Sequence, residues 1–123
     1  MTMIQLEHVT KSYVSYNGEQ SAVVDISFTV KQGQFVSLVG PSGCGKTSLL
    51  SIMAGLFPPT EGVVRIQGEL ITKSSPKIGY MLQQDYLLNW RTIKENIFLG
   101  LEIQNKRSSQ TEAHALYLLA EMG

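Results

Sequence analysis

GPSGCGKTS, residues 40–48, comes directly after the apolar run FVSLV, residues 35–39. Its glycines, proline, lysine and adjacent hydroxyl residues suit neither an apolar core nor a helix interior, so packing alone does not explain them. The stretch matches the pattern G-x-x-x-x-G-K-[ST], whose fixed positions are Gly40, Gly45, Lys46 and Thr47. Because a short apolar run precedes the pattern and a helical pattern follows it, we interpret the stretch as a phosphate-binding loop.

The chemistry expected of this loop follows from its residue types. Glycines let the backbone curl so that successive N–H groups point at an anion, and the start of the following helix also favours negative charge. We expect Lys46 to reach the β- and γ-phosphates of a nucleotide, and the Thr47 hydroxyl to bind Mg²⁺. Ser42 to Gly45 contribute mainly backbone groups, and Cys44 is a small filler rather than a nucleophile. The predicted nucleotide-binding residues of the stretch are Gly40, Ser42, Gly43, Cys44, Gly45, Lys46, Thr47 and Ser48.

Composition excludes several other classes of protein. Hydrophobic residues make up 43% and charged residues 16% of the 123 residues, which is typical of a globular domain and not of a disordered chain. Ten basic residues balance ten acidic ones without a basic run, so nothing supports nucleic-acid binding. A single cysteine excludes a disulfide within the chain. The longest apolar stretch, LLSIMAGLF, is far shorter than the roughly 20 residues of a bilayer span, so we expect a soluble chain whose membrane role comes through a partner.

The residues before the loop predict an antiparallel β-hairpin. Apolar and polar residues alternate in AVVDISFTV, residues 22–30, and β-type alternation also covers residues 4–9. Between these segments lies Asn17-Gly18, a strong hairpin signal because both residues tolerate a positive φ.

The residues around and after the loop predict three more strands and a helix. FVSLV is typical of a parallel strand that is covered on both faces. KTSLLSIMAGL, residues 46–56, has helical spacing and is stopped by two prolines. VVRIQ, residues 63–67, predicts a strand, and so do residues 78–82, which end just before Gln83.

The C-terminal part of the sequence predicts two helices. Thr92 is a plausible N-cap and Glu95 completes a capping box at the start of a helix through TIKENIFLGLEIQ. The polar stretch NKRSSQT, residues 105–111, predicts a loop before a second helix in residues 112–123.

Taken together, these features resemble the ATPase subunits of ABC (ATP-binding cassette) transporters. The resemblance rests on VTKSY, AVVDISFTV, the phosphate-binding loop, the stretch AGLFPPTEGVV and a glutamine after a predicted strand, all in the family's order. It implies an α/β fold, a P-loop NTPase core with an N-terminal antiparallel β-subdomain. It also implies an enzyme that couples Mg-ATP binding and hydrolysis to solute transport. Expected partners are transmembrane permease subunits and a second ATPase subunit, at a cytoplasmic site on the inner face of the cell membrane.

The resemblance also implies roles for two residues outside the loop. In this family an aromatic residue near the first strand stacks on adenine, and Tyr13 lies at the matching position; Tyr16 is the weaker rival because it falls in the predicted hairpin turn. Gln83, rather than Gln84, matches the glutamine that contacts Mg²⁺ and the attacking water. Lys46 and Gln83 are therefore the expected catalytic residues of this chain, and Thr47 and Gln83 the expected metal ligands.

A shorter stretch gives a hint of the transported solute. YLLNWRTIKENI resembles the LLPW-x-T segment of ATPase subunits that serve nitrate, sulfonate and taurine importers. Asn89 stands where that pattern has proline, and the surface from Gln83 to Arg91 is where the resemblance implies contact with a membrane partner.

Other parts of the family's machinery do not occur in these residues. The sequence contains no LSGGQ-like signature, no Walker B Asp-Glu after an apolar strand and no switch histidine. We therefore expect residues 1–123 to be one partial nucleotide-binding domain, truncated before those regions and not catalytic alone. Two alternatives stay open: a noncatalytic nucleotide-binding remnant, and another P-loop NTPase or kinase. A GTPase is disfavoured because NKRS, residues 105–108, fails the N-K-x-D pattern at its last position.

Overall fold

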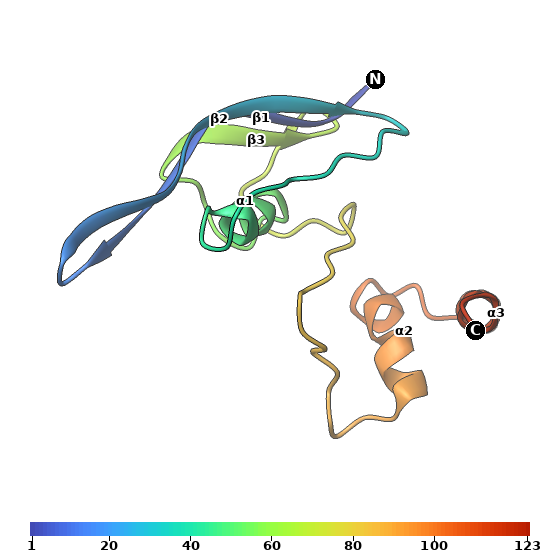
Figure 1. Ribbon diagram of the computed structural model, residues 1–123. Helices are drawn as coiled ribbons and strands as arrows, with labels where there is room; N and C mark the ends of the chain where they lie inside the picture. The colour runs from blue at the N-terminus through green and yellow to red at the C-terminus, as the bar shows by residue number, and fades with distance from the viewer. The chain divides into compact units, whose positions relative to one another are not determined.

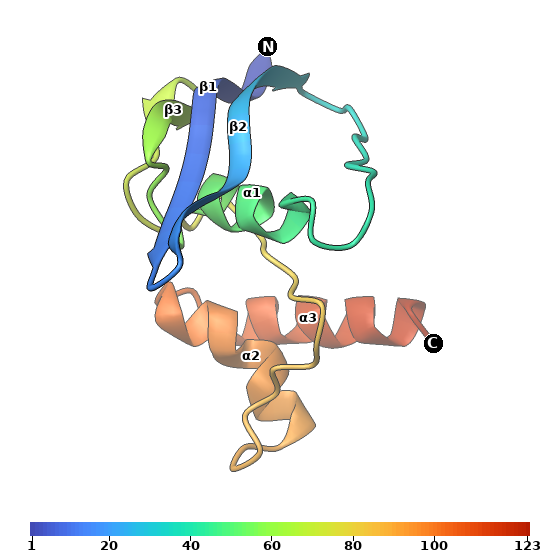
Figure 2. The same cartoon turned by 60° about the vertical axis from the view of Figure 1, so that its left-hand side comes forward.

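The computed structural model describes residues 1–123, which form two compact units, Met1–Gly79 and Tyr80–Gly123. In the first unit α1 lies against one face of a four-stranded antiparallel sheet of order β2-β1-β3-β4 (Figure 1 and Figure 2). Its elements are β1 (Thr2–Ser15), β2 (Gly18–Lys31), α1 (Lys46–Met53), β3 (Glu61–Ile66) and β4 (Glu69–Leu70). The second unit contains α2 (Ile93–Ile103) and α3 (Ser109–Glu121). Our assignment of residues 1–123 to one domain stays a prediction.

The core of the first unit lies between the sheet and α1. One apolar cluster gathers side chains from β1, β2, α1 and β3, and its buried members are Leu6, Val9, Val23, Leu49, Ile52 and Val64. Leu6, Ile26, Phe28 and the helical spacing after the loop supply apolar residues to this cluster as the pattern predicts. The register shifts of the hairpin change the phase of the alternation, so Val9 and Val23 enter the cluster and Val24 is 62% exposed. The hairpin, the helix after the loop and the strand near residue 63 are thus confirmed.

The β1–β2 hairpin carries a bulge in each strand. The pairing register shifts between Leu6 and Val9 and again between Val9 and Lys11. His8 and Asp25 lie in these irregular segments with φ of 50° and 48°, a left-handed conformation that is uncommon outside glycine. Side chains replace the missing ladder bonds, since Ser27 Oγ accepts the His8 N–H at 2.8 Å and Thr10 Oγ1 accepts the Asp25 N–H at 3.0 Å.

Capping side chains define the helices of the second unit. Thr92 Oγ1 accepts the Glu95 N–H at 3.1 Å and the Glu95 carboxylate accepts the Thr92 N–H at 2.7 Å, which confirms the predicted capping box. Ser108 and Thr111 form a second capping box, so α3 begins at Ser109. The predicted loop of residues 105–111 was wrong in its last three residues. These residues belong to α3, because Ser108 caps the helix.

Two of the predicted strands do not form. Residues 35–39 make no ladder with any strand, and Phe35 and Val39 are 94% and 93% exposed. Residues 78–82 form no strand either, and they lie across the boundary between the two units. A parallel strand is held by hydrogen bonds to a neighbour, and the strands of these 123 residues pair only with one another, in antiparallel ladders.

Gly62 offers a direct test of how β3 packs on the bulge of β1. A Cβ there would lie 2.2 Å from the His8 carbonyl oxygen and 2.4 Å from that of Glu7, with φ at +82°. Gly68 has the same backbone conformation, φ +81°, but open space around it. Gly68→Ala should lower the free energy of unfolding by about 1 kcal/mol, because an alanine there would only be strained by the left-handed backbone conformation. Gly62→Ala should cost at least about 1 kcal/mol more, because the backbone must move.

Urea unfolding followed by circular dichroism would measure both variants of this pair. Equal losses for Gly62→Ala and Gly68→Ala would contradict the close packing of β3 on the bulge.

Candidate nucleotide-binding site

The glycine-rich loop packs closely on β2. Gly45 has a φ of +94°, and a Cβ there would lie 2.2 Å from the backbone oxygen of Ala22. Gly43 is also left-handed, with a φ of +80°, but open space surrounds it. At Gly40 a Cβ would meet the Cys44 sulfur at 2.7 Å. The loop needs glycine at position 45 for space and at position 43 for conformation.

The start of α1 presents unpaired backbone donors next to this loop. Gly45 is the N-cap, no side chain caps the helix, and no acidic residue lies in its first turn. The first helical bond is from the Leu49 N–H to the Gly45 carbonyl oxygen, at 2.9 Å. The N–H groups of Lys46, Thr47 and Ser48 therefore point out of the helix start, where an anion is favoured.

Lys46 brings a full positive charge into the same loop. Its ammonium group donates to the carbonyl oxygens of Gly40 at 2.5 Å and Pro41 at 2.8 Å, and to the Cys44 sulfur at 3.4 Å. These contacts hold the side chain folded back over the loop. The half-buried lysine and the first turn of α1 thus form one cationic site that is suited to phosphate.

Tyr13 lies beside the start of α1. Its hydroxyl is 3.3 Å from Ser48 Oγ, and the Lys11 ammonium lies 5.3 Å from the centre of its ring. The ring is 46% exposed, whereas Tyr16 projects fully into solvent from the hairpin loop. The contact of Lys11 with the Tyr13 ring was not predicted from the sequence. The two-residue spacing could have indicated this contact, because residues two apart in a strand share a face.

The predicted metal ligands are oxygen donors of the kind that Mg²⁺ accepts alongside phosphate oxygens. The Thr47 hydroxyl is exposed at the start of α1. Gln83 is exposed and belongs to the second unit, whereas the loop belongs to the first. The expected position of Gln83 at the end of a strand is wrong, because residues 78–82 form none. No group of three or more His, Cys, Asp or Glu residues is arranged to hold a metal ion by itself.

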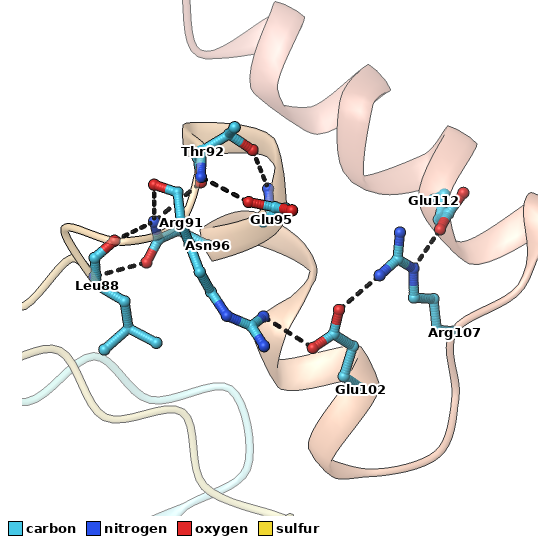
Figure 3. A network of polar contacts seen from close by, with 8 residues as sticks. All are labelled: Leu88, Arg91, Thr92, Glu95, Asn96, Glu102, Arg107 and Glu112. Atoms are coloured by element: carbon cyan, nitrogen blue, oxygen red, sulfur yellow. Dashed lines mark hydrogen bonds and ion pairs between the residues drawn. The ribbon is translucent and has the colours of Figure 1, made fainter.

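An ion-pair network in the second unit was not foreseen from the sequence (Figure 3). Arg91 Nη1 contacts Glu102 Oε2 at 2.9 Å, Arg107 contacts the other oxygen of Glu102 at 2.5 Å, and Arg107 also pairs with Glu112 of α3. The hydrogen bond from Arg91 lowers the pKa of Glu102, and that with Glu112 raises the pKa of Arg107.

The Thr92 backbone N–H likewise lowers the pKa of Glu95, at the start of α2. The stability that Glu95 and Glu102 contribute is complete above the ordinary glutamate pKa of about 4.3. It is lost as the pH falls through their lower folded values.

The family described as ABC transporter matches residues 23–123. An uncharacterized ABC transporter ATP-binding protein, YtlC of Bacillus subtilis, is 49% identical over the whole chain, which covers 47% of that protein. The taurine import ATP-binding protein TauB of a Jannaschia species is 34% identical over the whole chain, which covers 46% of it. The chain thus spans about half the length of these curated relatives.

A solved structure agrees with this result. The dimeric structure of the ATP-binding cassette MJ0796 in a post-hydrolysis state, bound to ADP and Pi, superimposes with a TM-score of 0.84 at 32% identity. The match covers 96% of this chain and 56% of that one. It confirms the predicted fold class, the N-terminal part of an ABC-type P-loop cassette with an antiparallel β-subdomain. None of the helices combines the length and the apolar character that a bilayer span requires. The family match covers most of the sequence, and the chain belongs to the ABC transporter family.

Proposed function

We propose that this chain is the nucleotide-binding part of an ABC transporter ATPase subunit, which couples the binding and hydrolysis of Mg-ATP to solute transport across a membrane. The observation that carries the proposal is the uncapped first turn of α1, with the Lys46 ammonium held in the same loop. Backbone N–H groups, a helix N-terminus and a lysine together complement the negative charge and the oxygen acceptors of a polyphosphate.

Within this site the side chains take separate tasks. Lys46 exchanges its contacts with the Gly40 and Pro41 carbonyls for phosphate oxygens. The Thr47 hydroxyl would hold Mg²⁺, and Tyr13, whose hydroxyl lies 3.3 Å from Ser48 Oγ, would stack on adenine. Outside the loop, the family resemblance assigns to Gln83, an exposed residue of the second unit, a contact with Mg²⁺ and with the attacking water. When bound, Mg²⁺ would neutralise part of the phosphate charge.

The family also suggests where the protein works. We assign it to the cytoplasmic side, peripheral on the inner face of the cell membrane, with permease subunits and a second ATPase subunit as partners. Relatives named for taurine and aliphatic sulfonate import support an importer of small sulfonated solutes. The segment from Gln83 to Arg91, which is exposed except at the half-buried Leu88 and Arg91, is the candidate contact for the permease.

Binding without turnover is what we expect of these 123 residues. The loop, Lys46 and Tyr13 all lie in the first unit, but the sequence contains no Asp-Glu pair to hold Mg²⁺ and activate water. Phosphoryl transfer depends on positioning and electrostatic stabilisation, so partial machinery loses most of the rate. ATPase activity of this chain that Lys46→Ala abolishes would contradict the expectation.

Lys46→Ala tests the phosphate site itself. The variant removes the only full positive charge in the loop, and affinity for a fluorescent ATP analogue should fall about tenfold or more. Lys73→Ala is the matched control, because this exposed lysine lies in the same unit outside the loop. Equal affinities of Lys46→Ala and the unchanged chain, measured by fluorescence titration, would refute the phosphate site.

Tyr13→Ala tests the base contact. Affinities for ATP and GTP analogues should fall alike, by roughly fivefold. Stacking depends on the π-face, which adenine and guanine both have, and not on the hydrogen-bonding edge of the base. Tyr13→Phe should be nearly neutral, since the bond to Ser48 is long and exposed. Tyr16→Ala serves as the control from the hairpin loop. A large loss in Tyr13→Phe, or a loss for only one nucleotide, would rule out stacking.

A further inference from the structure

A tight turn follows Gln83 and leads into α2. The Arg91 N–H donates to the Leu88 carbonyl oxygen at 3.0 Å, which closes the turn and leaves Asn89 and Trp90 at its tip. Trp90 is 80% exposed, so its own burial does little to hold the turn in place. Something else must fix this segment.

Asn96, in the first turn of α2, contacts the turn through both ends of its side-chain amide (Figure 3). Its Oδ1 accepts the Leu88 N–H at 2.8 Å, and its Nδ2 donates to the Leu88 carbonyl oxygen at 3.1 Å. The same Nδ2 donates to the Thr92 carbonyl oxygen at 2.9 Å and lies 3.4 Å from that of Arg91. Asn96 thus pairs with the Leu88 backbone as a neighbouring strand would.

This arrangement needs an amide of this length. An aspartate has the same shape but, when ionised, no donor, and it would face the carbonyl oxygens of Leu88 and Thr92 with negative charge. An alanine would leave the half-buried Leu88 N–H and carbonyl without their side-chain partner. The bonds therefore specify asparagine.

A second link holds the far side of the turn. Arg91 pairs with Glu102 at the other end of α2, and neither side chain of this pair is more than 30% exposed. Glu102 continues through Arg107 to Glu112 of α3. The turn is thereby tied to both helices of its unit.

We infer that Asn96 is a positioning residue: its amide fixes the Leu88–Arg91 turn on α2 and so fixes where Trp90 is presented. Asn96, the turn and Trp90 all lie in the second unit.

Trp90 reports on this turn directly, because it is the only tryptophan in the chain. In Asn96→Asp and Asn96→Ala, the decay of its fluorescence anisotropy should gain a fast component from local motion. Hydrogen exchange of the Leu88 amide should accelerate about tenfold, as expected for one lost hydrogen bond. Exchange at Phe98, which is buried in α2, should change much less, which separates local release from general unfolding.

Asn89→Asp is the matched control. It makes the same substitution in the same turn, next to Trp90, at an exposed side chain outside the hydrogen-bond network. Its anisotropy decay and its Leu88 exchange should match those of the unchanged chain.

Two results would overturn the inference about Asn96. A protected Leu88 amide and an unaltered anisotropy decay in folded Asn96→Asp would overturn the inference. So would a freely exchanging Leu88 amide in the unchanged chain, a result that needs no variant to fold. Neither measurement uses nucleotide, so failure of the Lys46 test would leave this result standing, and the reverse also holds.

Discussion

The close approach of Gly45 to the backbone of Ala22 is the constraint on which the first unit depends. At this contact the loop has no room for a side chain, and α1 begins at the next residue. The position of the helix start then sets the direction of its free N–H groups, the contact between Ser48 and Tyr13, and the burial of Leu49 and Ile52 against the sheet. A larger residue at position 45 would push the helix off β2 and disturb the core and the anion site together.

The second unit is held together by a different kind of interaction. Phe98 is its only buried apolar side chain, and the charged ends of Lys94 and Arg107 lie over its ring. Two capping boxes, the Asn96 amide and a chain of ion pairs supply the remaining order (Figure 3). Such polar contacts fix geometry more than they add stability, because ion pairs that stay partly exposed to solvent are weak. This suits the positioning role that we infer for Asn96.

Features that depend on nearby residues could be predicted from the sequence. The hairpin around Asn17, the helix after the loop and the Thr92–Glu95 capping box all rest on residues within a few positions of one another. The strands expected at residues 35–39 and 78–82 did not form, because a parallel strand also needs a neighbour elsewhere in the chain. The same limit applies to side chains: nothing in the sequence reveals that Asn96 reaches back to Leu88, or that Lys46 folds over the Gly40 carbonyl.

The central claim is that backbone N–H groups at the start of α1 hold phosphate. Titration of ATP into the isotope-labelled chain, followed by amide NMR spectra, tests it most directly, because each group gives its own signal. The account predicts that the largest shifts fall on Gly43, Gly45, Lys46, Thr47 and Ser48, and that pyrophosphate alone reproduces them. Binding of ATP with shifts elsewhere and none in residues 43–48, or no shift at saturating ATP, would contradict it.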